Sequence, residues 1–315
     1  KDNYILLYFY YVMIGTFLLL VIDGYIQFFF GSNLLGYPIY NENRISSFFG
    51  DELILGSFLS RLFPLLLALF IIKKKRKYEI YFIGIFFILI ELLIYISGDR
   101  TAFFFLNLSS FFIIILINKY QKFRLITFFI ALFLISILII NNDNHTKRMF
   151  IKPAINMGLI DGSKKKYVFT QAHDNLYRTA FNMFKDKPIF GYGPKMFRVI
   201  CKEKKYAVGK RHCNTHPHNF YIQLLAETGI IGTTFLLTLL AYVIYCFCKQ
   251  LKCIFLREER YLTDYQVCLL SCIFITVWPF SPNGNFFNNW LAICYSLPFG
   301  FYLQSIYGRN KNKLQ

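Results

Sequence analysis

The 315-residue sequence predicts an all-α polytopic membrane protein: a bundle of transmembrane helices with one long extramembrane loop. Its residues are 56% hydrophobic and 20% aromatic, and the apolar residues come in blocks of about twenty, the length that crosses a bilayer. Short clusters of Lys and Arg separate alternate blocks, which is the charge pattern that sets membrane topology. The net charge of +18 therefore indicates membrane orientation, and we expect no nucleic-acid partner.

Eight apolar blocks are candidate spans. They are Tyr4–Ile22, Leu53–Ile72, Tyr78–Ser97, Thr101–Ile117, Leu125–Ile140, Gly229–Phe247, Tyr265–Phe280 and Trp290–Ile306. If each block spans once, the basic connections Lys73–Lys77, Asn118–Arg124, Lys249–Arg260 and Arg309–Lys313 all fall on one side of the membrane. The positive-inside rule makes that side cytoplasmic, so the opposite side, periplasmic in a bacterium, holds the longest connection.

The long connection is the one place where a small folded subdomain is expected. The chain then divides into N-terminal spans, a periplasmic loop subdomain and C-terminal spans: 1–140, 141–217 and 218–315. Within the loop, Thr170–Lys185 has the apolar spacing of an amphipathic helix, with Leu176 and Ala180 on its apolar side. Thr170 is a candidate N-cap, and Asp174 and Arg178 are four residues apart and are expected to pair.

Two of the eight cysteines lie in this loop, whereas the others lie in or beside apolar spans. Because the periplasm is oxidising, we expect a disulfide between Cys201 and Cys213. It would close a loop of about a dozen residues and stabilise the fold by about 3 kcal/mol. A metal site from His212, Cys213, His216 and His218 is the alternative, but this spacing matches no zinc pattern, so we expect no metal.

The stretch His216–Gly232 leads from the polar loop into an apolar span. As one helix it would place His218, Ile222, Gly229 and Gly232 on a single face. The two glycines would let another helix approach closely, and the imidazole would lie at the water-side end. It is either an active-site base at the membrane edge or an interfacial histidine that caps a packed helix.

Several arginines occupy positions where a charge needs an explanation. Arg61 lies inside an apolar block and should therefore face a cavity or a partner. Arg100 follows Asp99 in a tight turn, where it extends to the membrane interface, pairs with Asp99, or binds phosphate, which a guanidinium matches bidentately. Arg178 in the loop helix and Arg44 in the first outer loop are further phosphate candidates. The residues alone do not decide between these interpretations.

Residues His218–Gly232 fit the pattern His-Asn-x9-Gly-x-x-Gly, which resembles the signature of the bacterial O-antigen ligase family. That family includes related O-antigen polymerases and protein O-oligosaccharyltransferases. Further stretches resemble the family in the same order: Asn43–Asp51, Ser97–Ala102 with Asp99 where Ser is usual, Tyr177–Ala180, and Lys187–Pro194. Family members have more N-terminal spans, so we expect the chain to continue upstream of Lys1.

The resemblance implies an architecture like that of the C-type glycosyltransferases and an enzyme of the bacterial inner membrane. It would transfer an undecaprenyl-pyrophosphate-linked glycan to the lipid A core on the periplasmic face, without metal or cofactor. His218 would be the general base, and Arg100 and Arg178 would stabilise the leaving pyrophosphate. Arg44 would contact the substrate, and Asn219 would orient the acceptor or the helix start.

Three alternatives to ligase activity follow from the same residues. Two belong to the family: an O-antigen or exopolysaccharide polymerase, and a protein O-oligosaccharyltransferase. The third is a non-enzymatic carrier or flippase for the lipid-linked glycan. A carrier needs a charged path through the bundle, and the apolar blocks offer few mid-span charges beyond Arg61, which favours the enzyme.

Overall fold

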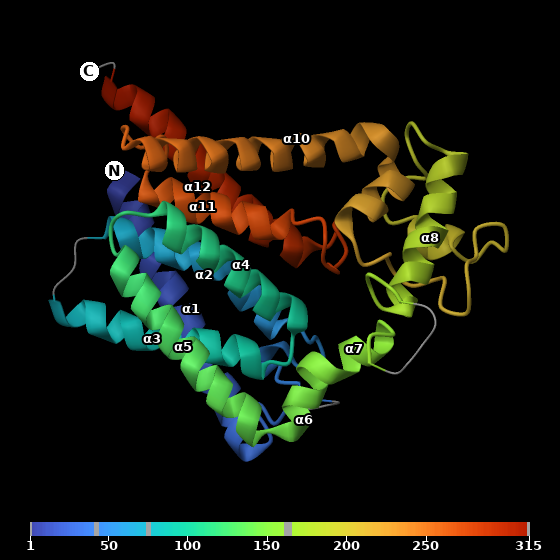
Figure 1. Ribbon diagram of the computed structural model, residues 1–315, viewed down its shortest axis with the longest axis horizontal. Coiled ribbons are helices and arrows are strands. Elements are labelled where there is room, and N and C mark those ends of the chain that lie inside the picture. The colour runs from blue at the N-terminus through green and yellow to red at the C-terminus, as the bar shows by residue number, and fades with distance from the viewer. Residues whose placement is uncertain (1, 41–43, 74–76, 161–165, 314–315) are drawn as a thin grey trace. The chain divides into compact units, whose positions relative to one another are not determined.

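The computed structural model describes residues 2–40, 44–73, 77–160 and 166–313 (Figure 1). The helices are α1 Asp2–Phe30, η1 Ser47–Phe49, α2 Leu55–Ile72, α3 Lys77–Ile96, α4 Arg100–Leu116, α5 Gln121–Asn141, α6 Asp143–Thr146, η2 Lys147–Ile151, α7 Lys152–Asn156, α8 Gln171–Asp186, α9 Phe197–Ile200, α10 Phe220–Leu256, α11 Asp264–Thr276 and α12 Asn289–Lys313. Within these ranges β-structure is limited to two isolated bridges, so the all-α prediction is confirmed. Asn43 and residues 74–76 of the first basic cluster lie outside the described residues.

Five of the described helices are long and apolar enough to cross a membrane: α1, α2, α3, α5 and α10. This confirms a polytopic helical membrane protein, although the sequence predicts eight spans. The other three predicted blocks also form helices. Two of these, α4 and α11, have only 17 and 13 residues, and α12 ends in a polar segment.

The chain forms two compact units, which are described separately. The first comprises Lys1–Met149, Cys246–Ile275 and Leu297–Gln315, and the second comprises Phe150–Tyr245 and Thr276–Ser296. This division follows contacts within the chain and not sides of a membrane. The three-part topology expected from the sequence therefore stays a prediction.

Helix α2 is the centre of the first unit. It is buried along nearly its whole length and packs against α1, α3 and α4, while α5 packs on α3. Arg61 of α2 is buried, as its position requires, and it has partners: its Nη1 donates to Ser57 Oγ at 2.5 Å, and its guanidinium lies 4.7 Å from the ring centre of Phe105. The expectation that Arg61 faces a partner is confirmed.

A second buried arginine in this unit is not anticipated from the sequence. Arg124 of α5 is fully buried and pairs with the equally buried Glu91 of α3, with 2.5 Å between Nη1 and Oε1. Its Nη2 also donates to Ser110 Oγ of α4 at 2.6 Å. Because a buried charge is tolerated only when it is paired and hydrogen-bonded, this cluster ties three helices together.

The core of the second unit forms under α8. The apolar side of that helix, which includes Leu176 and Ala180 as predicted, packs on Phe197, Tyr206 and the start of α10. Cys201 and Cys213 form the expected disulfide, with 5.2 Å between their Cα atoms. The disulfide closes a loop that lies on this core and thereby orders a segment with little regular secondary structure.

Candidate active site

Asn219 caps the first turn of α10. Its Oδ1 accepts hydrogen bonds from the backbone N–H groups of Tyr221 and Ile222, at 3.0 and 3.1 Å. Its Nδ2 donates to the carbonyl of Pro279 at 2.7 Å. Since both ends of this buried amide are used within the protein, the geometry favours the orienting role over direct contact with an acceptor.

The predicted helical face from His218 to Gly232 is not present, because His218 lies outside the helix. Its backbone is left-handed, with φ of +61°, a conformation that is uncommon for residues other than glycine. Its carbonyl accepts the backbone N–H of Asn283 at 2.8 Å and is 3.5 Å from the hydroxyl of Tyr177, which donates to it. The surrounding loops therefore hold the imidazole just ahead of α10.

The face is also interrupted at Gly229, where the backbone leaves the helical region, with φ of 63° and ψ of −164°. The change in direction is visible near the start of α10 (Figure 1). Peptide groups on both sides of this break bond to the turn after α8. Tyr192 and Gly193 donate to the carbonyls of residues 226 and 227 at 3.1 and 2.7 Å, and Ile230 donates to Pro188 at 2.8 Å.

The two glycine-containing motifs therefore meet through their backbones. A Cβ on Gly229 would lie 2.2 Å from the carbonyl oxygen of Ile189, and one on Gly191 would lie 2.4 Å from the carbonyl carbon of Glu227. The close approach expected at Gly229 is real, but its partner is an irregular turn and not another helix. Gly232 has its nearest neighbour in Thr228 of its own helix.

The imidazole of His218 is half-buried and lies among polar neighbours. Nδ2 of Asn214 lies 3.1 Å from its Nε2. Because an amide nitrogen can only donate, Nε2 accepts and the ring proton is on Nδ1. The rings of His216 and His173 lie beside it, with centroid separations of 4.1 and 5.6 Å. Nε2 therefore carries the basic lone pair of the His218 ring.

Burial disfavours the charged forms of His218 and His216. It lowers the pKa of His218 below the usual 6.5, and a hydrogen bond between the imidazole and the backbone of Asn283 opposes the shift only in part. Burial, followed by the nearby His218, lowers the pKa of His216 to about 3. A neutral imidazole at ordinary pH is what a general base requires. Within the described chain, no group of three or more His, Cys, Asp or Glu side chains is arranged to hold a metal ion.

Helix α8 brings Arg178 into the same unit as His218. Tyr177, its neighbour in sequence, contacts the His218 carbonyl, and His173 lies against the His218 ring. Arg178 forms the predicted pair with Asp174, with 2.9 Å between Nε and Oδ2, and 57% of its side chain is exposed. Thr170 is the N-cap residue, as predicted, but its hydroxyl bonds to Nδ1 of His173 and makes no capping bond to a backbone N–H.

Arg100 and Arg44 belong to the first unit. Arg100 is exposed and begins α4, whose N-cap is Asp99: Oδ1 accepts from the N–H of Ala102 at 3.1 Å. Arg44 donates to the carbonyl of Leu53 at 2.8 Å. A Cβ placed on Gly98, two residues before Arg100, would lie 3.6 Å from Cγ of Arg44 and 2.9 Å from Nε of Arg148.

Arg148 is not singled out by the sequence, yet it donates from Nε to the carbonyl of Gly98 at 3.1 Å. It and Arg44 thus lie next to the turn that leads into Arg100. The sequence signal is weak, because Arg148 is one of several basic residues in a polar stretch.

A buried pair in α10, one amide and one carboxylate, is also not predicted from the sequence. Gln223 donates to Glu227 Oε2 at 2.9 Å and to Asn285 Oδ1 at 2.8 Å, while Glu227 Oε1 accepts the N–H of Phe197 at 2.8 Å. A signal for it is present in the sequence: Gln223 and Glu227 are four residues apart in an otherwise apolar helix, and such polar residues need partners.

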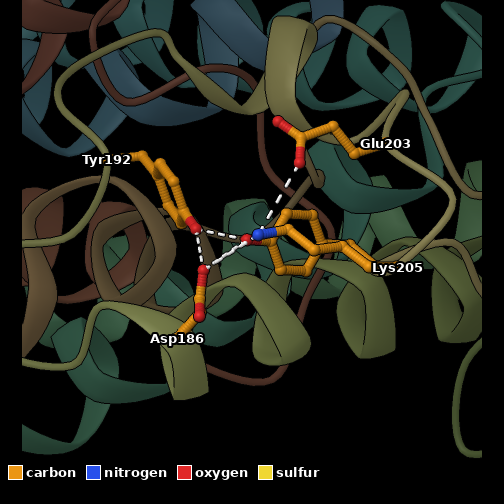
Figure 2. A network of polar contacts seen from close by, with 5 residues as sticks. Asp186, Tyr192, Glu203 and Lys205 are labelled. Atoms are coloured by element: carbon orange, nitrogen blue, oxygen red, sulfur yellow. Dashed lines mark hydrogen bonds and ion pairs between the residues drawn. The ribbon is translucent and has the colours of Figure 1, made fainter.

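An exposed polar network holds the turn after α8. Asp186 accepts hydrogen bonds from the hydroxyls of Tyr192 and Tyr206, and Lys205 reaches both Asp186, at 3.3 Å, and Glu203, at 3.7 Å (Figure 2). The two tyrosine hydroxyls and the lysine hold the pKa of Asp186 down, at about 2. The end of α8 is therefore fixed to the disulfide-closed loop.

Part of the chain is similar to a known protein family. Residues 84–237, just under half of the chain, match the family model described as O-antigen ligase. The matched stretch contains Arg100, Arg178 and His218 and begins after Arg44. A search of the curated proteins finds no match. The match supports an enzyme of the O-antigen ligase or polymerase type in general. The family match thus confirms that the chain resembles the O-antigen ligase family over residues 84–237.

Proposed function

We propose that the protein is an O-antigen ligase-type glycosyltransferase of the bacterial inner membrane. It transfers an undecaprenyl-pyrophosphate-linked glycan to the lipid A core on the periplasmic face. The observation that carries this proposal is the imidazole of His218. It is neutral, its Nε2 is the accepting nitrogen, and it is held by loop contacts next to the helix that bears Arg178.

In the proposed reaction, the acceptor hydroxyl displaces the Asn214 amide from Nε2 of His218 and gives its proton to that nitrogen as its oxygen bonds to the anomeric carbon. The bond between that carbon and the pyrophosphate oxygen breaks, and the lipid pyrophosphate leaves with the electron pair. A positioned general base contributes typically about 10²–10⁴-fold to such a step. Asn219 acts indirectly, because it fixes the helix start that follows His218.

Negative charge grows on the pyrophosphate as it leaves, and fixed cations stabilise it. Arg178, in the same unit as His218, takes this role, since it is exposed and a guanidinium binds phosphate oxygens bidentately. The family resemblance assigns the same role to Arg100. Arg44 contributes beside the turn that leads into Arg100. In this mechanism, arginine side chains of the protein stabilise the negative charge of the leaving pyrophosphate.

The test is glycan attachment in cells that lack their own ligase and express the full-length protein. We expect His218→Ala, Arg178→Ala and Arg100→Ala to abolish attachment, with glycan accumulating on the carrier lipid, while membrane insertion is unchanged. His212→Ala is the matched control, because that histidine lies in the disulfide-closed loop and bonds to the carbonyl of Gly209 in the same loop. It should leave attachment intact.

Normal attachment with His218→Ala would exclude the mechanism. Glycans of reduced length on the lipid A core would indicate a polymerase instead, and glycan on Ser or Thr of a protein would indicate a protein transferase. Movement of labelled lipid-linked glycan across proteoliposomes without acceptor modification would indicate a carrier.

A further inference from the structure

A groove of about 440 Å³ runs along α8 on the side that carries Arg178. One face of the helix from Tyr177 to Lys185 forms its floor, and Val208 and Ile222 form its walls. All of these residues belong to the second unit. The groove is larger than the space a single ion needs, and its size suits one sugar ring.

The walls of the groove are fixed before any ligand binds. The N–H of Val208 donates to Thr179 Oγ1 of α8 at 3.2 Å, and the loop that carries Val208 is closed by the disulfide Cys201–Cys213. Ile222 lies in the first turn of α10, which Asn219 caps. A preformed site avoids the cost of ordering its loops when it binds.

The groove combines an aromatic floor with two positive charges. Phe181 is 43% exposed and offers a flat apolar face, the kind of surface on which the C–H face of a sugar can pack. Nζ of Lys185 lies 5.0 Å from the centre of that ring, and Arg178 lies at the other end. The described residues that line the groove include no carboxylate. Asp174 lies outside the groove and pairs with Nε of Arg178, so it offsets part of that charge. The lining itself remains positive, which favours an anionic ligand.

The spacing of the two charges defines the ligand further. Arg178 and Lys185 are seven residues apart, which corresponds to about 10 Å along an α-helix. One monosaccharide with an anionic group at each end fits between two such charges. Asn182 lies between them, and its Nδ2 donates to the carbonyl of Tyr206 at 3.4 Å, which leaves its amide oxygen to accept from a sugar hydroxyl.

We propose that the groove binds an acidic sugar 1-phosphate unit of the transferred glycan. The phosphate lies on Arg178, the ring packs on Phe181, and the acidic group of the sugar pairs with Lys185. This inference rests on the proposed function, because it extends the site at which Arg178 holds the pyrophosphate. Lys185 is then the residue that selects acidic over neutral sugars.

The test is calorimetric binding to the purified full chain in detergent micelles, with glucuronic acid 1-phosphate, glucose 1-phosphate and inorganic phosphate as probes. We expect the acidic sugar phosphate to bind about tenfold more tightly than glucose 1-phosphate, since a charge-assisted hydrogen bond is worth about that factor. Lys185→Met should abolish the difference. The side chain is exposed, so the substitution should leave the fold intact.

Lys187→Met is the matched control. It removes a charge from the same end of α8, but this lysine lies over Tyr192, at 4.4 Å, and outside the groove, so the tenfold preference should persist. Equal binding of the two sugar phosphates, a preference that survives Lys185→Met, or inorganic phosphate binding as tightly as the acidic sugar phosphate would each overturn the proposal.

The attachment assay separates this inference from the proposed function. Loss of attachment with His218→Ala combined with no sugar preference would leave the transferase standing and remove the subsite. Normal attachment with His218→Ala combined with a preference that depends on Lys185 would remove the mechanism and leave the subsite.

Discussion

Replacing Gly229 by alanine should destabilise the second unit. The backbone of α10 on both sides of this residue is hydrogen-bonded to the turn after α8. The φ of 63° and ψ of −164° at Gly229 lie in a region essentially restricted to glycine, and an L side chain there costs about 1–3 kcal/mol. The added Cβ would also lie 2.2 Å from the carbonyl oxygen of Ile189. That neighbour is backbone and cannot rotate away, so the turn itself must move.

Moving the turn puts its backbone hydrogen bonds at risk. The bonds from Tyr192, Gly193 and Ile230 measure 3.1, 2.7 and 2.8 Å, and each contributes about 0.5–1.5 kcal/mol. Loss of two of them together with the strain amounts to roughly 3 kcal/mol or more. A change of that size is a large fraction of the roughly 5–15 kcal/mol by which most domains are stable.

The assay is thermal unfolding in detergent, followed by circular dichroism, with Gly300→Ala as the matched control. Gly300 lies in α12, and a Cβ added there would have none of the described neighbours within 4 Å, so its substitution should be neutral or slightly stabilising. Equal unfolding temperatures for the two variants would refute the role assigned to Gly229.

Three further substitutions or conditions test other parts of the structure. Cys201→Ser should lower stability by about 3 kcal/mol and expose the loop up to Cys213 to protease; a cleavage pattern like that of wild type would contradict this. Burial lowers the pKa of His218 below 6.5, so most of the base is still neutral at pH 6.5. The transfer rate should therefore fall only below that pH, and a rate that already falls above pH 6.5 would argue against this base. Arg124→Met should destabilise by about 3–5 kcal/mol, because it leaves Glu91 buried without its cation, and adding Glu91→Leu should recover most of the loss in a denaturation assay.

Local spacing in the sequence is enough to predict the helical class, the loop helix and its ion pair. Asp174 and Arg178 are four residues apart, and this spacing places them side by side on any helix. The disulfide between Cys201 and Cys213 follows from the compartment expected for the loop. The helix and its ion pair depend on residues close together in sequence, where periodicity is informative.

The features that the sequence does not predict depend on partners far apart in the chain. The spacing of residues around Gly229 predicts one continuous helix, and the break arises from hydrogen bonds to residues 188–193. His218 leaves the helix because Asn219 caps it and Asn283 holds its carbonyl. Glu91 and Arg124 lie on different helices, and neither position alone indicates a pair.

The backbone pairing between residues 188–193 and 226–231 also limits where the sequence tolerates insertions and deletions. Each bond links one particular peptide group to another, so inserting or deleting a single residue in either segment shifts every later partner out of register. The exposed tip near Lys210, within the disulfide-closed loop, is free of this constraint. Homologous sequences should therefore place their gaps at that tip, whereas the two paired segments should keep a fixed number of residues.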